Sequence, residues 1–312
     1  MKVTAYVSHH DSPRHDTGWS HPDHQGRIPA ITRAVHRDMV ALWDPILQLE
    51  AAPAAEADLR LVHTQRHIAE VQATAMMADA QGKVLALGGV PVSGASWDAA
   101  IAAAGGGITA VDAVLAGEAR NAFVAARPPG RGARPDAAGG FSLFNNVAVA
   151  ARHLRERRGS ARVLVVAWGS EPADTLRLAL GYDPAVSVVS LHARPEAADA
   201  PEPSRGDVAL EPGSGGEAFA AAQRQALEAI PPEETPDFVL LSAGFDILAG
   251  DPLGRLAVAP RDVHDLTRDL REWADARAGG RLVSILEGGY DADATARAVV
   301  QHLRALAGVA GD

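Results

Sequence analysis

The chain has 312 residues, no cysteine, and a formal net charge of −10 with a sequence pI of 5.6. Without cysteine it can hold no disulfide, thiolate zinc site or cysteine nucleophile. The acidic balance argues against nucleic acid as a partner, and no apolar run approaches the length of a membrane-spanning helix. We therefore expect a cytoplasmic protein that does not contact a membrane. The length allows one large or two small domains, and the strand–helix order described next, without internal repeats, predicts a single domain over residues 1–312.

The predicted elements alternate between strand and helix along most of the chain. Residues 2–8 are expected to form a first strand, and residues 29–42 a helix. A short strand over 59–62, a helix over 66–79 and a loop over 82–95 come next. A long alanine-rich helix then runs to residue 115, with Ser96 as its expected N-cap. The triplet Gly105-Gly106-Gly107 within it predicts a point where another backbone approaches closely.

The second half of the chain continues the same alternation. Strands are expected over 121–126, 162–167, 186–191, 237–242 and 281–286. Helices are expected over 144–157, 173–180, 215–229, 260–276 and 291–306. This order predicts an α/β fold with a mostly parallel sheet and helices on both of its faces.

Two polar segments lie outside this pattern. The loop 9–24 contains five histidines, but no pair has the helical spacing and carboxylate partner that a zincin requires. We interpret it as a solvated entry loop, with a metal site as the lesser alternative. The tract 193–205 is rich in alanine, proline and glutamate, which is typical of a mobile surface loop.

The most informative stretch is 162–175. Its apolar run 163–166 is expected to be a strand buried on both faces of the sheet. In open α/β sheets the chemistry lies just past the carboxyl ends of such strands. The loop that follows here holds two carboxylates but no histidine, which is a poor set of side chains for catalysis. A triad built on Ser170 is not expected, since no Gly-x-Ser-x-Gly pattern surrounds it.

Three strand ends carry recognisable motifs. These are Arg127-Pro-Pro-Gly130 with Gly140-Phe-Ser-Leu-Phe-Asn-Asn146, Leu241-Ser-Ala-Gly-Phe-Asp246 with Ala249-Gly-Asp-Pro-Leu-Gly254, and Leu286-Glu-Gly-Gly-Tyr290. With His21-Pro22, Arg27 and Val62-His63, they resemble the histone deacetylase and acetylpolyamine amidohydrolase superfamily over nearly the whole chain. The resemblance implies the three-layer arginase/deacetylase fold, with a mostly parallel sheet of about eight strands.

The family chemistry implied by this resemblance is zinc-dependent amide hydrolysis. Two Asp and one His hold the zinc, paired histidines transfer protons, and a Tyr hydroxyl helps to bind the oxyanion. The resemblance places the histidine pair at Arg131 and Gly132, and two of the three metal ligands at Gly169 and Glu171. All four positions therefore carry substitutions.

Three family positions are retained: the third metal ligand, Asp246; the oxyanion tyrosine, Tyr290; and Phe141, which lines the acyl tunnel in the family. Structural reasons can keep Asp246 and Tyr290 in place without any catalytic role. The long loop that the family carries after the strand ending at His192 is much shorter here, so we expect a reshaped or open pocket. His192 is the nearest spare histidine, but its family counterpart is not a ligand.

We infer a deacetylase-like pseudoenzyme with no catalytic zinc and no other cofactor, acting by binding or assembly. Glu171 and Asp246 could supply only two of the three ligands of a catalytic zinc site. The partner is expected to be an unknown protein, another copy of the chain, or a small acyl or anionic ligand. The alternatives are a divergent amidohydrolase with an altered metal site and a small-molecule sensor that uses the former acyl pocket. We hypothesise that Arg131 points inward and pairs with Asp246 or Glu171, directly or through a water. The alternative is that its side chain points into solvent.

Overall fold

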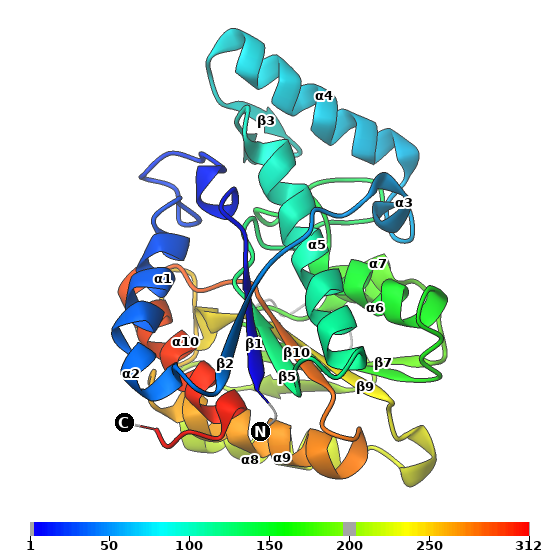
Figure 1. The fold of residues 1–312 in the computed structure, drawn as a ribbon, viewed down its shortest axis with the longest axis vertical. Helices are drawn as coiled ribbons and strands as arrows, with labels where there is room; N and C mark the ends of the chain where they lie inside the picture. Colours follow the sequence, from blue (N-terminus) through cyan, green and yellow to red (C-terminus); the bar gives the residue numbers. More distant parts are fainter. Residues whose placement is uncertain (1–2, 196–203, 312) are drawn as a thin grey trace.

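The computed structural model describes residues 3–195 and 204–311. A parallel sheet of eight strands lies at its centre, in the order β2-β1-β5-β10-β9-β6-β7-β8 (Figure 1). The strands are β1 (Thr4–Ser8), β2 (Ile46–Glu50), β5 (Asn121–Val124), β6 (Val163–Trp168), β7 (Val186–Ala193), β8 (Asp207–Leu210), β9 (Phe238–Ala243) and β10 (Leu282–Leu286). The predicted fold class and the size of the sheet are therefore confirmed.

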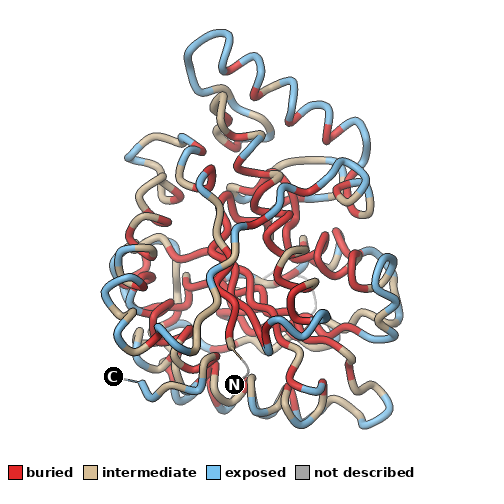
Figure 2. Tube along the Cα trace, viewed as in Figure 1, coloured by how far each residue is buried: buried red, intermediate tan, exposed pale blue. Residues whose placement is uncertain are grey.

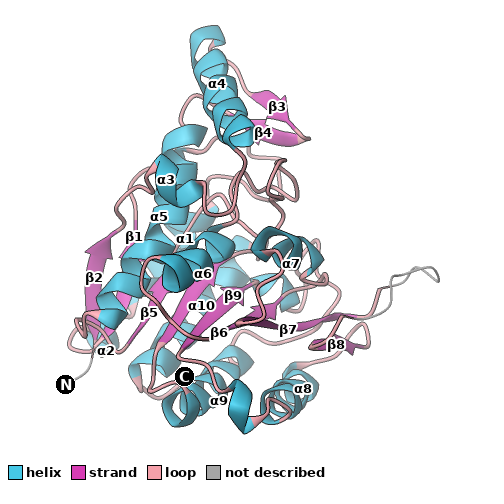
Figure 3. Cartoon of the chain, turned by 90° about the vertical axis from the view of Figure 1, so that its right-hand side faces the viewer, coloured by secondary structure: helices cyan, strands magenta, loops and turns pink. Residues whose placement is uncertain are grey.

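Helices cover both faces of this sheet (Figure 3). One face carries α5 (Ser96–Leu115), α6 (Asn146–Glu156) and α7 (Asp174–Leu180). The other carries α1 (Arg27–Arg37), α8 (Gly216–Glu228), α9 (Asp262–Arg277) and α10 (Ala292–Ala307). The strands between them are mostly buried (Figure 2).

Strand β6 illustrates why an unbroken apolar run forms the middle of such a fold. All of its residues are buried, and successive side chains alternate between the two faces. Val163, Val165 and Ala167 pack with the α5–α7 face. Leu164, Val166 and Trp168 pack with the opposite face. Both faces are apolar, so no polar residue interrupts the run.

Several predicted elements need correction in the N-terminal half. Residues 59–62 are not a strand, because the short helix α3 (Glu56–Leu59) and a turn occupy that region. The loop expected over 82–95 contains a hairpin of β3 (Leu85–Leu87) and β4 (Val90–Val92). The remaining α-helices are α2 (Met39–Leu42) and α4 (Gln65–Gln81). Helix α4 projects beyond the sheet in Figure 1. Of the tract 193–205, residues 196–203 lie outside the described residues.

Helix α5 confirms one expectation and corrects two. A Cβ atom at Gly105 would lie 1.9 Å from the carbonyl oxygen of Ala52, so a neighbouring backbone does approach there. Ser96 is the first residue of the helix rather than its N-cap, which is Ala95. Within the described residues, α5 is also the one helix long and apolar enough to span a membrane, which the sequence reasoning missed. However, 67% of its most apolar stretch is buried in the protein, as in a core helix.

Candidate functional site

A pocket of about 240 Å³ lies past the carboxyl ends of β6, β9 and β10. This is the edge of the sheet where α/β folds place their ligands. Its lining includes six of the seven positions that the sequence singles out, all but Gly169, together with one further carboxylate: Arg131, Gly132, Phe141, Glu171, Asp246, Tyr290 and Glu287.

Arg131 points into this pocket but does not form the predicted ion pair. Its Nη1 donates to the carbonyl oxygen of Trp168 at 2.7 Å, and its Nη2 donates to the carbonyl oxygen of Glu171. Among the described residues, no ion pair joins it to Asp246 or Glu171. The guanidinium thus binds two main-chain carbonyl oxygens, one at the end of β6 and one just past it. A sequence pattern does not reveal such bonds, because every residue offers the same carbonyl group.

The position that follows β6 has no room for a side chain while Arg131 lies there. A Cβ atom at Gly169 would lie 1.8 Å from the Nη1 atom of Arg131. A second position is closed by backbone: a Cβ atom at Gly132 would lie 2.4 Å from the carbonyl oxygen of Gly139. At both glycines, the space that a side chain would need is therefore filled by other atoms of this chain.

Asp246 lies in the 3-10 helix η3 (Phe245–Ile247) directly after β9. Its Oδ2 accepts the backbone N–H of Ser170 at 3.1 Å, and its Oδ1 has no hydrogen-bond partner among the described atoms. Burial raises the pKa of this carboxyl, and the Arg131 guanidinium offsets part of that rise. Asp246 is thus held in place by the end of β6 but is incompletely paired.

Glu287 was missed by the sequence reasoning, although it stands in the Leu286–Tyr290 motif at the end of buried strand β10. It is 1% exposed, and its Oε2 accepts the backbone N–H groups of Gly130 at 2.6 Å and Arg131 at 2.9 Å. Burial raises its pKa to about 7, against the opposing effect of these two bonds. A lone carboxylate at the end of a buried strand was the signal that could have found it. Its role is to anchor the loop that delivers Arg131.

Two aromatic rings also line the pocket. Phe141 and Tyr290 meet edge to face with 5.5 Å between ring centroids. The guanidinium carbon of Arg27 lies 5.0 Å from the centroid of the Tyr290 ring, and its Nε donates to the carbonyl oxygen of Gly289 at 2.7 Å. Asp251 accepts the backbone N–H of Tyr290 at 2.6 Å. The tyrosine is thus fixed from both sides, and burial raises the pKa of its hydroxyl.

The remaining candidate ligands point elsewhere. The carboxylate of Glu171 is 3.2 Å from the Nη2 atom of Arg255, and its side chain is 69% exposed. His192 is buried and its Nδ1 bonds to the carbonyl oxygen of Ala193 at 2.9 Å. A catalytic zinc needs three converging protein ligands. In the described part of the chain, Asp246 has no two such neighbours, so the side chains of this pocket do not fit a zinc ion.

Comparison with known proteins gives consistent matches. The sequence profile of the histone deacetylase domain matches residues 21–306. The polyamine deacetylase HDAC10 of Homo sapiens is 32% identical over 98% of this chain and 48% of its own length, so the chain spans about half of that relative. A histone deacetylase-like amidohydrolase of Pseudomonas aeruginosa is 35% identical over 78% of this chain and 66% of its own. The crystal structure of the HDA15 HD domain superposes with a TM-score of 0.86 at 27% identity, covering 99% of this chain and 89% of that one.

Proposed function

The chain belongs to the histone deacetylase domain family, and from this premise we propose that it is a deacetylase-like pseudoenzyme. It keeps the fold and a pocket at the family site but acts by binding or assembly, without a catalytic zinc. The relatives above are named as deacetylases and as an amidohydrolase. The proposal is that this chain departs from them in chemistry and keeps their architecture.

The observation that carries the proposal is the position of the Arg131 guanidinium. It occupies the space of a side chain at Gly169, where the family has a metal ligand. One residue thus stands at a catalytic-histidine position and fills a ligand position at the same time. A proton-transfer group contributes typically about 10²–10⁴-fold to such reactions. Loss of that group together with two of the three ligands removes both the base and the electrophile.

The pocket supports a binding role for small molecules. Its volume is about 240 Å³, and Phe141 and Tyr290 give it an apolar wall. Both terminal nitrogens of Arg131 are engaged with carbonyl oxygens, and Asp246 and Glu287 lie close by. An anion would therefore meet two carboxyl groups and a cation that already has partners. A compact neutral acyl group fits this environment better than an anion.

The test combines metal content with turnover. We expect elemental analysis of the purified chain to give no zinc that depends on Asp246, and we expect no hydrolysis of acetyl-lysine peptides or acetylated polyamines. The matched control is Asp246→Asn, which should leave both measurements unchanged. Turnover that requires one equivalent of zinc and is lost in Asp246→Asn would overturn the proposal and establish a divergent amidohydrolase.

A further inference from the structure

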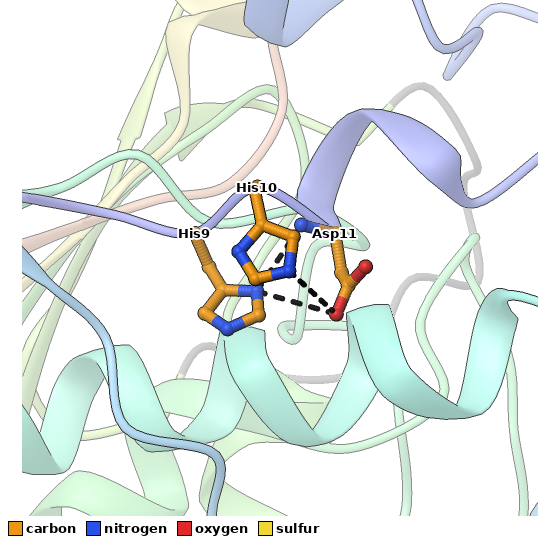
Figure 4. Close-up of side chains that lie close together, drawn as sticks. All are labelled: His9, His10 and Asp11. Carbon is orange, nitrogen blue, oxygen red and sulfur yellow. Dashed lines mark hydrogen bonds and ion pairs between the residues drawn. The ribbon is translucent and has the colours of Figure 1, made fainter.

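The loop directly after β1 brings together three side chains with metal-binding atoms: His9, His10 and Asp11 (Figure 4). We propose that they bind one divalent transition-metal ion such as Zn²⁺, at a site separate from the pocket at β6 and β9. Two imidazoles and one carboxylate are ligands that zinc accepts readily.

The distances between the donor atoms suit such an ion. The Oδ2 atom of Asp11 lies 3.6 Å from Nδ1 of His9 and 3.7 Å from Nε2 of His10. All three donor atoms lie within 4.8 Å of one another. With metal–ligand bonds of about 2.0–2.2 Å, neighbouring donors of a tetrahedral site are about 3.3–3.6 Å apart. Small side-chain rotations would therefore bring the three atoms onto one ion.

Outer partners already orient two of the three ligands. Nδ1 of His10 is 2.9 Å from Oε1 of Glu50, so the ring presents Nε2 toward Asp11. Glu50 ends β2 and pairs in register with Ser8 of β1, which fixes the two chain segments side by side. Arg14 binds the Oδ1 atom of Asp11 at 2.5 Å and leaves Oδ2 for the ion. A carboxylate behind a ligating histidine is the usual second layer of a metal site.

An ion could reach this site from solvent. The side chain of His10 is 69% exposed, and His9, His10 and Glu50 line a surface groove of about 580 Å³. The fourth coordination position therefore faces water. Nδ1 of His9 now accepts the backbone N–H of Asp11 at 3.1 Å, and the metal would replace that bond.

The test is a titration of the metal-free full chain with zinc chloride. Calorimetry measures the binding, and competition with a chromophoric chelator gives a second measurement of the affinity. We expect one equivalent to bind, with at least about 10-fold weaker binding in His10→Gln and Asp11→Asn and a similar loss in Glu50→Gln. His36→Gln, which alters an exposed histidine on α1, is the matched control and should bind as the parent does. Circular dichroism of each metal-free variant checks that it folds.

The contrary outcomes are distinct. If the parent chain binds no zinc, or if His36→Gln weakens binding as much as His10→Gln, the inference is wrong and the pseudoenzyme proposal stands. If Asp246→Asn abolishes zinc binding while His10→Gln does not, the metal lies in the pocket, and both the inference and the pseudoenzyme proposal fail.

Discussion

Arg131 and Gly169 should behave as one coupled unit in a double-mutant cycle. In Gly169→Ala, the added Cβ atom would lie 1.8 Å from Nη1 of Arg131 and would expel the guanidinium. Both bonds to the carbonyls of Trp168 and Glu171 would then break. A bond to a charged group contributes about 1.5–3 kcal/mol, but one of these two lies at the exposed end of the side chain. We therefore expect the free energy of unfolding of Gly169→Ala to be about 2 kcal/mol below that of the parent.

Arg131→Ala should lose the same bonds, so its free energy of unfolding should also fall by about 2 kcal/mol. In the double variant the space is already empty, so the alanine at position 169 should add little, giving a coupling energy of about 2 kcal/mol. With about 2.1 cal/mol/K of unfolding entropy per residue over 312 residues, each single variant should melt about 3 °C below the parent. Urea unfolding and thermal melts of the four proteins measure this.

The control is Arg66→Ala, because the Arg66 side chain is 70% exposed. Its free energy of unfolding should stay within about 0.5 kcal/mol of that of the parent. Strict additivity of Arg131→Ala and Gly169→Ala would refute the reasoning, because it would mean that the guanidinium does not occupy the space beside residue 169.

Three further outcomes are expected. Burial raises the pKa of Glu287 from its ordinary 4.5 to about 7, so its contribution to stability is fully present below pH 4.5 and is lost as the pH rises to about 7. Between these two pH values, the free energy of unfolding of Glu287→Gln in urea titrations should rise relative to that of the parent by up to about 3 kcal/mol; a difference that does not change with pH would contradict this. The triple variant Arg131→His, Gly169→Asp, Glu171→His should gain a zinc ion in the pocket, and adding Asp246→Asn to it should remove that ion, as measured by elemental analysis. If the triple variant gains no zinc, the backbone of the pocket itself has changed. Gly105→Ala should destabilise the chain by at least about 2 kcal/mol because of the contact with Ala52. Its control, Gly82→Ala, meets no atom within 4 Å and should lower the free energy of unfolding by only about 1 kcal/mol, because Gly82 has φ +59°; equal Tm values for the two variants would refute the close approach.

The central strands could be predicted from the sequence because burial on both faces demands unbroken apolar runs, as in β6 and β9. The edge strands β2 and β8 could not, because they are short and half-exposed and so carry a mixed pattern. In the pocket, the charge of the site favoured an inward direction for Arg131 as a hypothesis, beside the alternative that it points into solvent. Its bonds to main-chain oxygens could not be predicted, because every residue type offers the same carbonyl and only the fold places it.

The order of the strands has a consequence for synthesis on the ribosome. β10 joins β5 to β9 in the middle of the sheet, yet it is the last strand to be made. Until residues 282–286 emerge, the chain can form only two partial sheets, β2-β1-β5 and β9-β6-β7-β8, each with an unpaired inner edge. Such edges readily pair with other chains. A nascent chain stalled before β10 should therefore depend on chaperones far more than the finished protein does.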